Sequence, residues 1–156
     1  MIIFDAHADL MQPTKNPSHE EVFTALIESG WKPENLVFIG LRKIEIEEKK
    51  VIDEKKIQCF SPEENNDKII SYLNEKTKGK EVYVTIDIDC LDPKFARGVS
   101  YPENNGMTKK QFFEILTWIK KHVNVQTYDV VEVVEKNDVH EKTITVAREI
   151  VDVVMQ

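Results

Sequence analysis

The chain has 156 residues, a net charge of −7 and a sequence pI near 5.2, with 41% hydrophobic and 31% charged residues. This composition is ordinary for a globular protein with one domain over residues 1–156, which buries roughly 70% of the surface of its unfolded chain. The acidic balance argues against nucleic acid and membrane surfaces as partners, and no apolar run approaches the roughly 18 residues of a membrane span. Because the chain has two cysteines and no signal-peptide pattern, we expect a reduced, cytoplasmic protein.

Short apolar runs and helical periodicity alternate along the chain. Strands are predicted over residues 2–5, 36–41, 57–60, 81–89 and 127–134. Helices are predicted over residues 18–29, 44–55, 61–79, 108–122 and 140–154. Three of these helices open with a capping-box pattern, at Ser18, Ser61 and Thr108. The last helix should bury an apolar stripe of Ile144, Ala147, Ile150, Val151 and Val154. Strands that alternate with helices imply a mostly parallel sheet and the α/β class.

Three carboxylates lie at the end of the fourth predicted strand or just after it, at Asp87, Asp89 and Asp92. Alternate residues of a strand share a face, so Asp87 and Asp89 are expected to point the same way near its end. The loop over residues 90–107 is too long for a simple connector, which favours a functional loop. Two interpretations stay open. The acids form either a solvated turn or a metal or catalytic site, since open α/β sheets bind ligands at the carboxyl ends of strands.

A second acidic cluster follows the first apolar run. Asp5, His7 and Asp9 alternate with alanines, so all three would project to one side of an extended segment. Two carboxylates and an imidazole form a mixed oxygen and nitrogen set, which suits divalent Mn, Fe, Co or Zn better than Ca or Mg. Two such clusters, each after an apolar strand, indicate a metal site more specifically than either cluster alone.

These motifs resemble those of the ureohydrolases, the family of arginase, agmatinase and formiminoglutamase. Residues 4–9 read FDAHAD and are similar to the DAHxD motif of that family. Residues 85–93 read TIDIDCLDP and are similar to its SxDxDxxDP motif. The order and spacing of the motifs agree along nearly the whole chain.

Later segments extend the resemblance with some departures. Residues 95–108 match the substrate loop of the family, although Arg97 stands where a proline is usual. Residues 128–133 resemble its late DxxEx segment, and the asparagine-proline that follows in the family is absent from residues 133–136. These departures leave the identity of the substrate open.

The resemblance also implies a missing portion. Ureohydrolases are roughly twice this length, and an earlier GGDHS motif supplies one metal-binding histidine. This chain has no such motif, so we expect either a natural short form or a protein that another chain completes. The family's sheet, carried over to the strands present, implies the order 5-4-1-2-3 in a three-layer α/β sandwich with helices on both faces. The two acidic clusters then become neighbours.

The resemblance implies two manganese ions. By position, Asp5 and Asp87 would bridge both ions, His7 and Asp89 would complete one site, and Asp9 with the absent histidine would complete the other. The first site has all its ligands and the second lacks its only imidazole. We therefore expect one firm Mn²⁺ or other divalent site, and a second that is weak or vacant.

The catalytic roles come from the same resemblance. In the family, a metal-activated hydroxide attacks the guanidinium carbon and urea leaves. Asp9 would orient the hydroxide, Glu132 would bind the guanidinium, and His19 would pass protons to the leaving amine. Gly98 would permit a tight turn of the substrate loop. The residues alone leave ordinary readings open, with Glu132 as a polar strand residue and His19 as an exposed residue of a first helical turn.

Three functions therefore compete. The first is a metal-dependent C–N hydrolase that acts on a small guanidino or related amide substrate. The second is a non-catalytic relative that binds metal or ligand, or a subunit completed by another chain. The third is a single-metal amide hydrolase of the deacetylase type, with Asp5, His7 and Asp87 as ligands.

The last predicted strand also predicts assembly. In the resembled family it pairs with a strand of the N-terminal portion, so here it would be a sheet edge. Residues 130–134 are strongly apolar and lack the proline or lysine that protects an exposed edge. We therefore expect a homo-oligomer in which two such edges meet or are covered.

Overall fold

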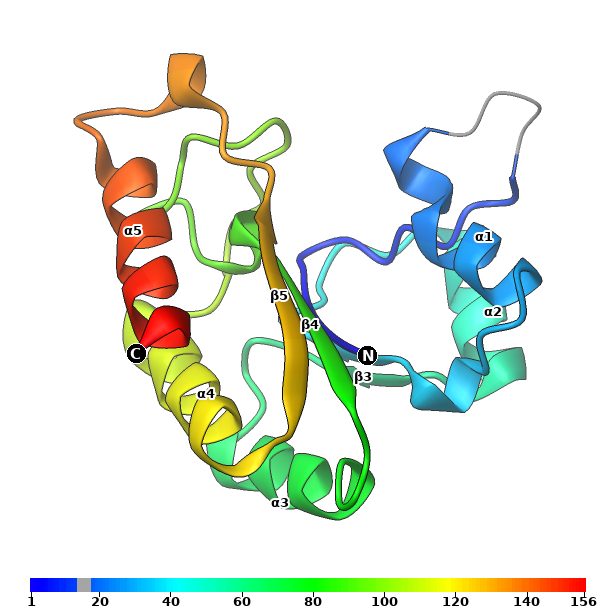
Figure 1. Ribbon diagram of the computed structural model, residues 1–156. Helices are drawn as coiled ribbons and strands as arrows, with labels where there is room; N and C mark the ends of the chain where they lie inside the picture. Colours follow the sequence, from blue (N-terminus) through cyan, green and yellow to red (C-terminus); the bar gives the residue numbers. More distant parts are fainter. Residues whose placement is uncertain (14–17) are drawn as a thin grey trace.

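A five-stranded parallel sheet forms the centre of the molecule in a computed structural model that describes residues 1–13 and 18–156 (Figure 1). Its order is β3-β2-β1-β4-β5, which is the predicted order read from the other edge. The strands are β1 (Ile2–Phe4), β2 (Val37–Ile39), β3 (Gln58–Phe60), β4 (Val82–Asp87) and β5 (Val125–Val131). The predicted fold class and strand order are confirmed.

Helices cover both faces of this sheet. They are α1 (Val22–Glu28), α2 (Ile46–Lys55), α3 (Asn66–Lys76), α4 (Lys109–His122) and α5 (Lys142–Met155). Figure 1 places α3, α4 and α5 on one side and α1 and α2 on the other. Within the described residues, no helix is long and apolar enough to cross a membrane.

Alternation along β1 divides the core between the two faces. Ile2 and Phe4 pack in the cluster under α3, α4 and α5, whereas Ile3 packs in the cluster under α1 and α2. All three side chains are buried because β1 is flanked by β2 and β4 and covered on both faces. A strand in this environment carries no polar side chain until it ends, and the first polar residue after it is Asp5.

The two acidic clusters meet because β1 and β4 are neighbours. Their register pairs Phe4 with Ile86, so the next residues, Asp5 and Asp87, leave the sheet side by side. This is the carboxyl edge of a parallel sheet, and the strand order reverses between β1 and β4. Ligands of open α/β sheets bind at such a point.

The fourth strand ends two residues earlier than predicted. β4 stops at Asp87, and a 3₁₀ turn over Ile88–Cys90 follows. The side chain of Asp87 causes this ending, because one of its carboxylate oxygens accepts a hydrogen bond from the amide of Asp89 at 2.9 Å. Contrary to the sequence prediction, Asp87 and Asp89 therefore do not share a face by strand alternation, although both line the same cavity. The last strand likewise runs from Val125 to Val131 and not over 127–134.

Helix caps follow the predictions in two of three cases. Ser18 and Thr108 each form a capping box, although the first turn after Ser18 is 3₁₀. The predicted cap at Ser61 is wrong, because residues 61–64 close a turn through a hydrogen bond from the Glu64 amide to the Ser61 carbonyl. Asn65 caps α3 instead, and its side chain accepts from the amide of Asp67 at 2.7 Å.

The buried face of α5 is also shifted from its prediction. Thr143, Val146 and Ile150 are the buried residues, whereas Val151 is 46% exposed. The Thr143 hydroxyl fixes this rotation because it accepts a hydrogen bond from the amide of Gly98 in the loop after β4. A polar residue with a buried partner has replaced part of the expected apolar stripe.

Candidate metal centre

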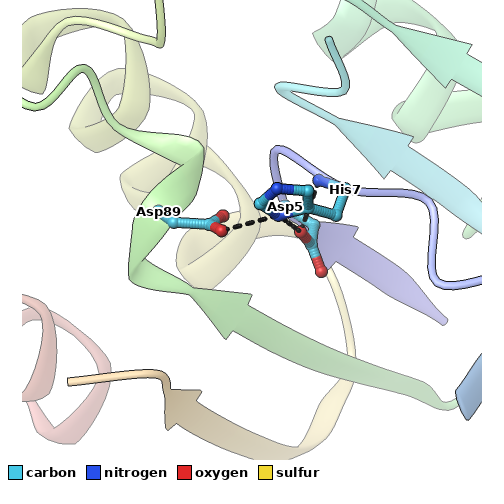
Figure 2. A group of neighbouring side chains, drawn as sticks. All are labelled: Asp5, His7 and Asp89. Carbon is cyan, nitrogen blue, oxygen red and sulfur yellow. Dashed lines mark hydrogen bonds and ion pairs between the residues drawn. The ribbon is translucent and has the colours of Figure 1, made fainter. Parts of the chain in front are cut away.

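The centre of the candidate site is an imidazole held between two buried carboxylates, drawn in Figure 2. His7 Nδ1 lies 2.8 Å from Asp89 Oδ2 and 3.8 Å from Asp5 Oδ1. One ligand atom from each of these three residues lies within 4.8 Å of the others, which is close enough for a single ion. The ligands come from the segment after β1 and from the turn after β4, so the sheet topology alone brings them together.

Backbone amides fix each carboxylate of this centre. The Ala6 amide donates to Asp89 Oδ1 at 3.0 Å, and the His7 amide donates to Asp5 Oδ1 at 2.7 Å. The Asp89 amide donates to Asp87 Oδ1. The acids are therefore positioned before any ligand binds, at no further cost in side-chain ordering.

Burial and mutual repulsion disfavour negative charge on these acids. Burial is the main cause that raises the pKa of Asp5 well above its usual range, and Asp87 and Asp89 add repulsion. Burial and the neighbouring Asp89 raise the pKa of Asp87 to about 9. Burial lowers the pKa of His7, but the hydrogen bond to Asp89 and the negative charges of Asp89, Asp9 and Glu103 together outweigh it, so the net pKa is raised. Closely packed carboxylates with such pKa values favour either protons or a cation between them.

A cavity of about 190 Å³ opens above this centre and collects most of the other predicted residues. Its walls include His7, Asp9, His19, Asp87 and Glu132, and also Asp89. Asp5 lines the adjoining cavity, where Asp9, His19, Asp87 and Glu132 appear again. Seven of the eight predicted site residues therefore lie around one connected space.

The outer residues of this space are more exposed than the centre. His19 is exposed and stacks on Tyr101, with 5.7 Å between the ring centroids. Glu132 is exposed directly after β5, with a positive φ of 62°. Burial raises the pKa of Asp9 to about 6, and His7 and His19 oppose the increase. Asp9 also has a positive φ of 48°, and its carbonyl accepts from the amide of Phe23 at the start of α1.

Gly98 lies apart from this space. A Cβ at Gly98 would approach Asp138 Cβ within 2.7 Å and Thr143 Oγ1 within 2.9 Å. The glycine therefore lets the loop after β4 pack against α5 and the segment before it, and it is absent from the walls of both described cavities. This position gives no support to a direct contact with substrate.

The structure adds wall residues that the sequence did not single out. Glu48 is buried and accepts hydrogen bonds from the amides of Leu10 and Glu45, which ties α2 to the segment after Asp9. Glu103 Oε1 lies 3.9 Å from His7 Nε2, on the opposite side of the ring from Asp89. Glu103 belongs to the long loop over residues 90–107, and two signals pointed to that loop without singling out Glu103: its length and the resemblance of residues 95–108 to a substrate loop.

The donor set at the centre fits a divalent ion. Two carboxylates and one imidazole are the ligands that Mn, Fe, Co and Zn accept, and their ligand atoms are already grouped. The group that the structure brings together, Asp5, His7 and Asp89, contains three of the four ligands expected for the first site. It differs from the triad of Asp5, His7 and Asp87 that the single-metal alternative would use. Asp87 and Asp9 are the further oxygen donors that line the space.

The fold and the site together define the class of protein, a parallel α/β protein with a group of buried carboxylates and an imidazole at the carboxyl ends of its central strands. Comparison with known families narrows this class. The model of the Arginase family matches residues 1–156, and the chain belongs to that family.

Individual relatives agree with this assignment. An arginase of Bacillus caldovelox is 30% identical over an alignment of 171 positions, which covers 94% of this chain and 56% of the relative. An agmatinase of Citrobacter koseri is 33% identical over 147 residues, which cover 92% of this chain and 46% of the relative. The chain thus spans about half the length of the curated relatives it matches.

Solved structures show the same fold. The arginase from Bacillus caldovelox superposes with a TM-score of 0.85 at 26% identity, over 98% of this chain and 59% of that chain. The proclavaminate amidino hydrolase from Streptomyces clavuligerus superposes with a TM-score of 0.89 at 24% identity, over 99% of this chain and 53% of that chain.

Proposed function

We propose that this chain is a metal-dependent C–N hydrolase of the ureohydrolase type that acts on a small guanidino or related substrate. The observation that carries the proposal is the group of Asp5, His7 and Asp89 in a chain of the Arginase family. Relatives named arginase and agmatinase support a guanidino group as the target.

In this proposal Asp5, His7 and Asp89 hold one divalent ion, which we take to be Mn²⁺. Asp87 and Asp9 offer oxygen ligands to a weaker second ion. A bound divalent ion lowers the pKa of water enough to supply hydroxide near neutral pH. The amides of Ala6 and His7 keep the carboxylates in place while substrates enter and leave.

The remaining residues act on the substrate and its protons. Asp9 lines the space beside the centre, where its carboxylate would orient the attacking water and accept its proton. Glu132 offers a carboxylate to the planar donor fork of a guanidinium. His19, held against Tyr101 at the rim, returns a proton to the leaving amine.

The test is product release by the purified chain with added Mn²⁺. Arginine, agmatine, guanidinobutyrate and formiminoglutamate are compared, with detection of urea or, for the last substrate, of formamide. Turnover of at least one substrate that disappears in Asp87→Ala supports the proposal. A wild-type chain that binds Mn²⁺ and turns over none of them would refute catalysis by this chain alone.

A second candidate is a subunit that another copy completes. Val131 and Val133 are 42% and 38% exposed at the edge strand β5 and just beyond it, and Glu132 stands between them. A homodimer that joins these edges would cover apolar surface and place one protomer's edge beside the partner's site. This candidate predicts activity that depends on protein concentration.

A third candidate is a single-metal amide hydrolase, which the grouping of three ligands around one position supports, with Asp89 in the place expected for Asp87. It predicts release of acetate from acetylated amines with one bound ion per chain and no release of urea.

A further inference from the structure

The imidazole of His7 lies between two carboxylates, and the proposed metal centre uses only one of them. Nδ1 faces the centre, 2.8 Å from Asp89 Oδ2. Nε2 faces outward, 3.9 Å from Glu103 Oε1. Among the described residues, Asp5, Asp89 and Glu103 are the carboxylates within 4.0 Å of a ring nitrogen of His7.

A single nitrogen of Arg42 fixes the backbone of both flanking residues. Arg42 Nη2 donates to the Asp89 carbonyl at 2.8 Å and to the Glu103 carbonyl at 2.7 Å. Its Nε donates to the Asn104 carbonyl at 3.0 Å, and Nη1 donates to the carbonyls of Gly40 and Cys90. Every hydrogen bond of this guanidinium among the described residues goes to a main-chain oxygen. Arg42 therefore sets the distance between the turn that carries Asp89 and the loop that carries Glu103.

The loop of Glu103 is held on its other side by a contact that requires glycine. A Cβ at Gly106 would lie 2.4 Å from the Asp92 amide nitrogen, which no side chain tolerates. This close approach lets the Met107 amide donate to the Cys90 carbonyl and the Asp92 amide donate to the Met107 carbonyl, both at 3.0 Å. Glu103 is therefore attached to the turn after β4 through its own carbonyl and through a short parallel bridge three to four residues later.

We propose that Glu103 is a positioning residue for His7, which it orients for metal binding through the charge of its carboxylate, 3.9 Å from Nε2. A neutral imidazole carries its proton on one nitrogen and a lone pair on the other. Before an ion binds, Asp89 at 2.8 Å keeps a proton on Nδ1. When a cation binds Asp5 and Asp89 it displaces that proton, and the carboxylate near Nε2 then favours the remaining proton there, which leaves the lone pair of Nδ1 directed at the ion. Carboxylates that face the outer nitrogen of a metal-binding histidine act in this way on affinity. The inference rests on the metal site of the proposed function, and not on hydrolysis.

Glu20 provides a matched control for the charge of Glu103. It lines the same cavity and is exposed, but it lies outside the set of carboxylates within 4.0 Å of His7. If negative charge in the cavity were all that attracted a cation, loss of either charge would weaken binding alike. If Glu103 acts through the imidazole, only its loss has a large effect.

The experiment measures Mn²⁺ affinity by calorimetric titration for the wild type, Glu103→Gln, Glu103→Leu and Glu20→Gln. We expect about tenfold weaker binding in Glu103→Gln, a larger loss in Glu103→Leu, and a change within about twofold in Glu20→Gln. The metal-free melting temperatures of all four proteins should agree within about 2 °C, because Glu103 is held through its carbonyl and not through its side chain. In Zn²⁺-loaded protein, the Nε2 proton resonance of His7 should move upfield in Glu103→Leu and stay in place in Glu20→Gln.

The outcomes separate this inference from the proposed function. Unchanged affinity in both Glu103 variants, an equal loss in Glu20→Gln, or a wild type that binds no Mn²⁺ would each overturn the role of Glu103. A wild type that binds Mn²⁺ and responds to Glu103 as expected, yet turns over no guanidino substrate, would overturn the hydrolase proposal and leave the role of Glu103 intact.

Discussion

The strands β1 and β5 both lead into the candidate site, yet they build it in opposite ways. β1 has three residues, all buried, and has a partner strand on each side. β5 has seven residues, pairs among the described residues with β4 alone, and buries none of its side chains fully. The residue after β1 is the buried Asp5, which is held by the amide of His7, whereas the residue after β5 is the exposed Glu132.

This difference separates the proposed metal centre from the proposed substrate side of the site. The inner carboxylates sit where the chain surrounds them completely, so their geometry is set by the fold. The outer residues His19 and Glu132 stand where the described chain leaves an edge and an open wall. The metal ligands can therefore be complete in this chain while the substrate side depends on what covers β5.

The comparison of β1 with β5 predicts its largest effect for the free energy of unfolding. Phe4→Ala removes a fully buried ring that packs edge-on against Phe112, and it should lower the free energy of unfolding by about 3–5 kcal/mol. Val131→Ala, at the exposed end of β5, should change it by less than about 0.5 kcal/mol. Urea denaturation of the two variants measures both values. Similar losses would mean that β5 is buried in solution by a partner.

Metal affinity should depend on the inner residues of the site and not on the outer ones. Asp89→Ala removes the oxygen next to His7 Nδ1 and leaves the Ala6 amide without its acceptor, so Mn²⁺ binding should weaken at least about 100-fold. Glu132→Gln should leave Mn²⁺ affinity within about threefold and reduce turnover instead. Calorimetric titration and the product assay read the two effects. A comparable loss of metal in Glu132→Gln would contradict the separation of inner and outer residues.

The stability of metal-free protein should fall as pH rises from 5 to 9. The folded pKa values of Asp5, Asp9 and Asp87 are raised above the value of an unfolded aspartate, so the folded state binds more protons than the unfolded chain in this range. His7 also has a raised pKa, so the stability that it contributes is likewise lost as pH rises. The lowered pKa of the Met1 amine, about 6, opposes the trend between pH 6 and 8.

Three raised carboxyl groups outweigh one amine, so we expect a decrease in melting temperature of about 5 °C or more between pH 5 and 9. Asp87→Asn should flatten this dependence. Saturating Mn²⁺ should reverse it, because the ion takes the place of the protons. A melting temperature that rises with pH in metal-free protein would show that the centre is not buried as described.

Assembly through β5 should have the smallest effect on the free energy of unfolding, but it changes the mass of the particle in solution directly. If exposed β5 edges meet, Val131→Lys and Val133→Lys should convert a dimer to a monomer with little change in thermal stability. Light scattering at micromolar concentration measures the mass. A monomeric wild type, or a dimer indifferent to both lysines, would refute the homodimer.

The inner part of the molecule was predictable from the sequence because its signals are local. The apolar runs before Asp5 and Asp87 predict strands buried on both faces, and the parallel order comes from the family resemblance. The grouping of Asp5 with Asp89 then follows from adjacency of two strands. The Asp5, His7 and Asp9 spacing also pointed to this region, although the chain leaves the sheet after Phe4 and Asp9 adopts a positive φ.

The features that the sequence did not predict depend on which side chains form hydrogen bonds with the main chain, and hydrophobic periodicity does not reveal this. Asp87 ends its strand because its side chain accepts a hydrogen bond from the Asp89 amide. Asn65, and not Ser61 as its pattern predicts, is the N-cap of α3. The buried face of α5 differs from the predicted one because the Thr143 hydroxyl accepts a buried hydrogen bond from the amide of Gly98. Glu103 and Arg42 meet His7 and Asp89 only through long-range contacts across three loops, and no local spacing indicates them.

The central claim is that Asp5, His7 and Asp89 hold a divalent ion, and anomalous diffraction from crystals soaked in Mn²⁺ tests it most directly. Data collected on both sides of the manganese absorption edge identify the element as well as the position. The account predicts one strong anomalous peak in contact with the three ligand groups, and at most a weaker one beside Asp9 and Asp87. Soaked crystals of the folded protein with no manganese peak at this centre would contradict it.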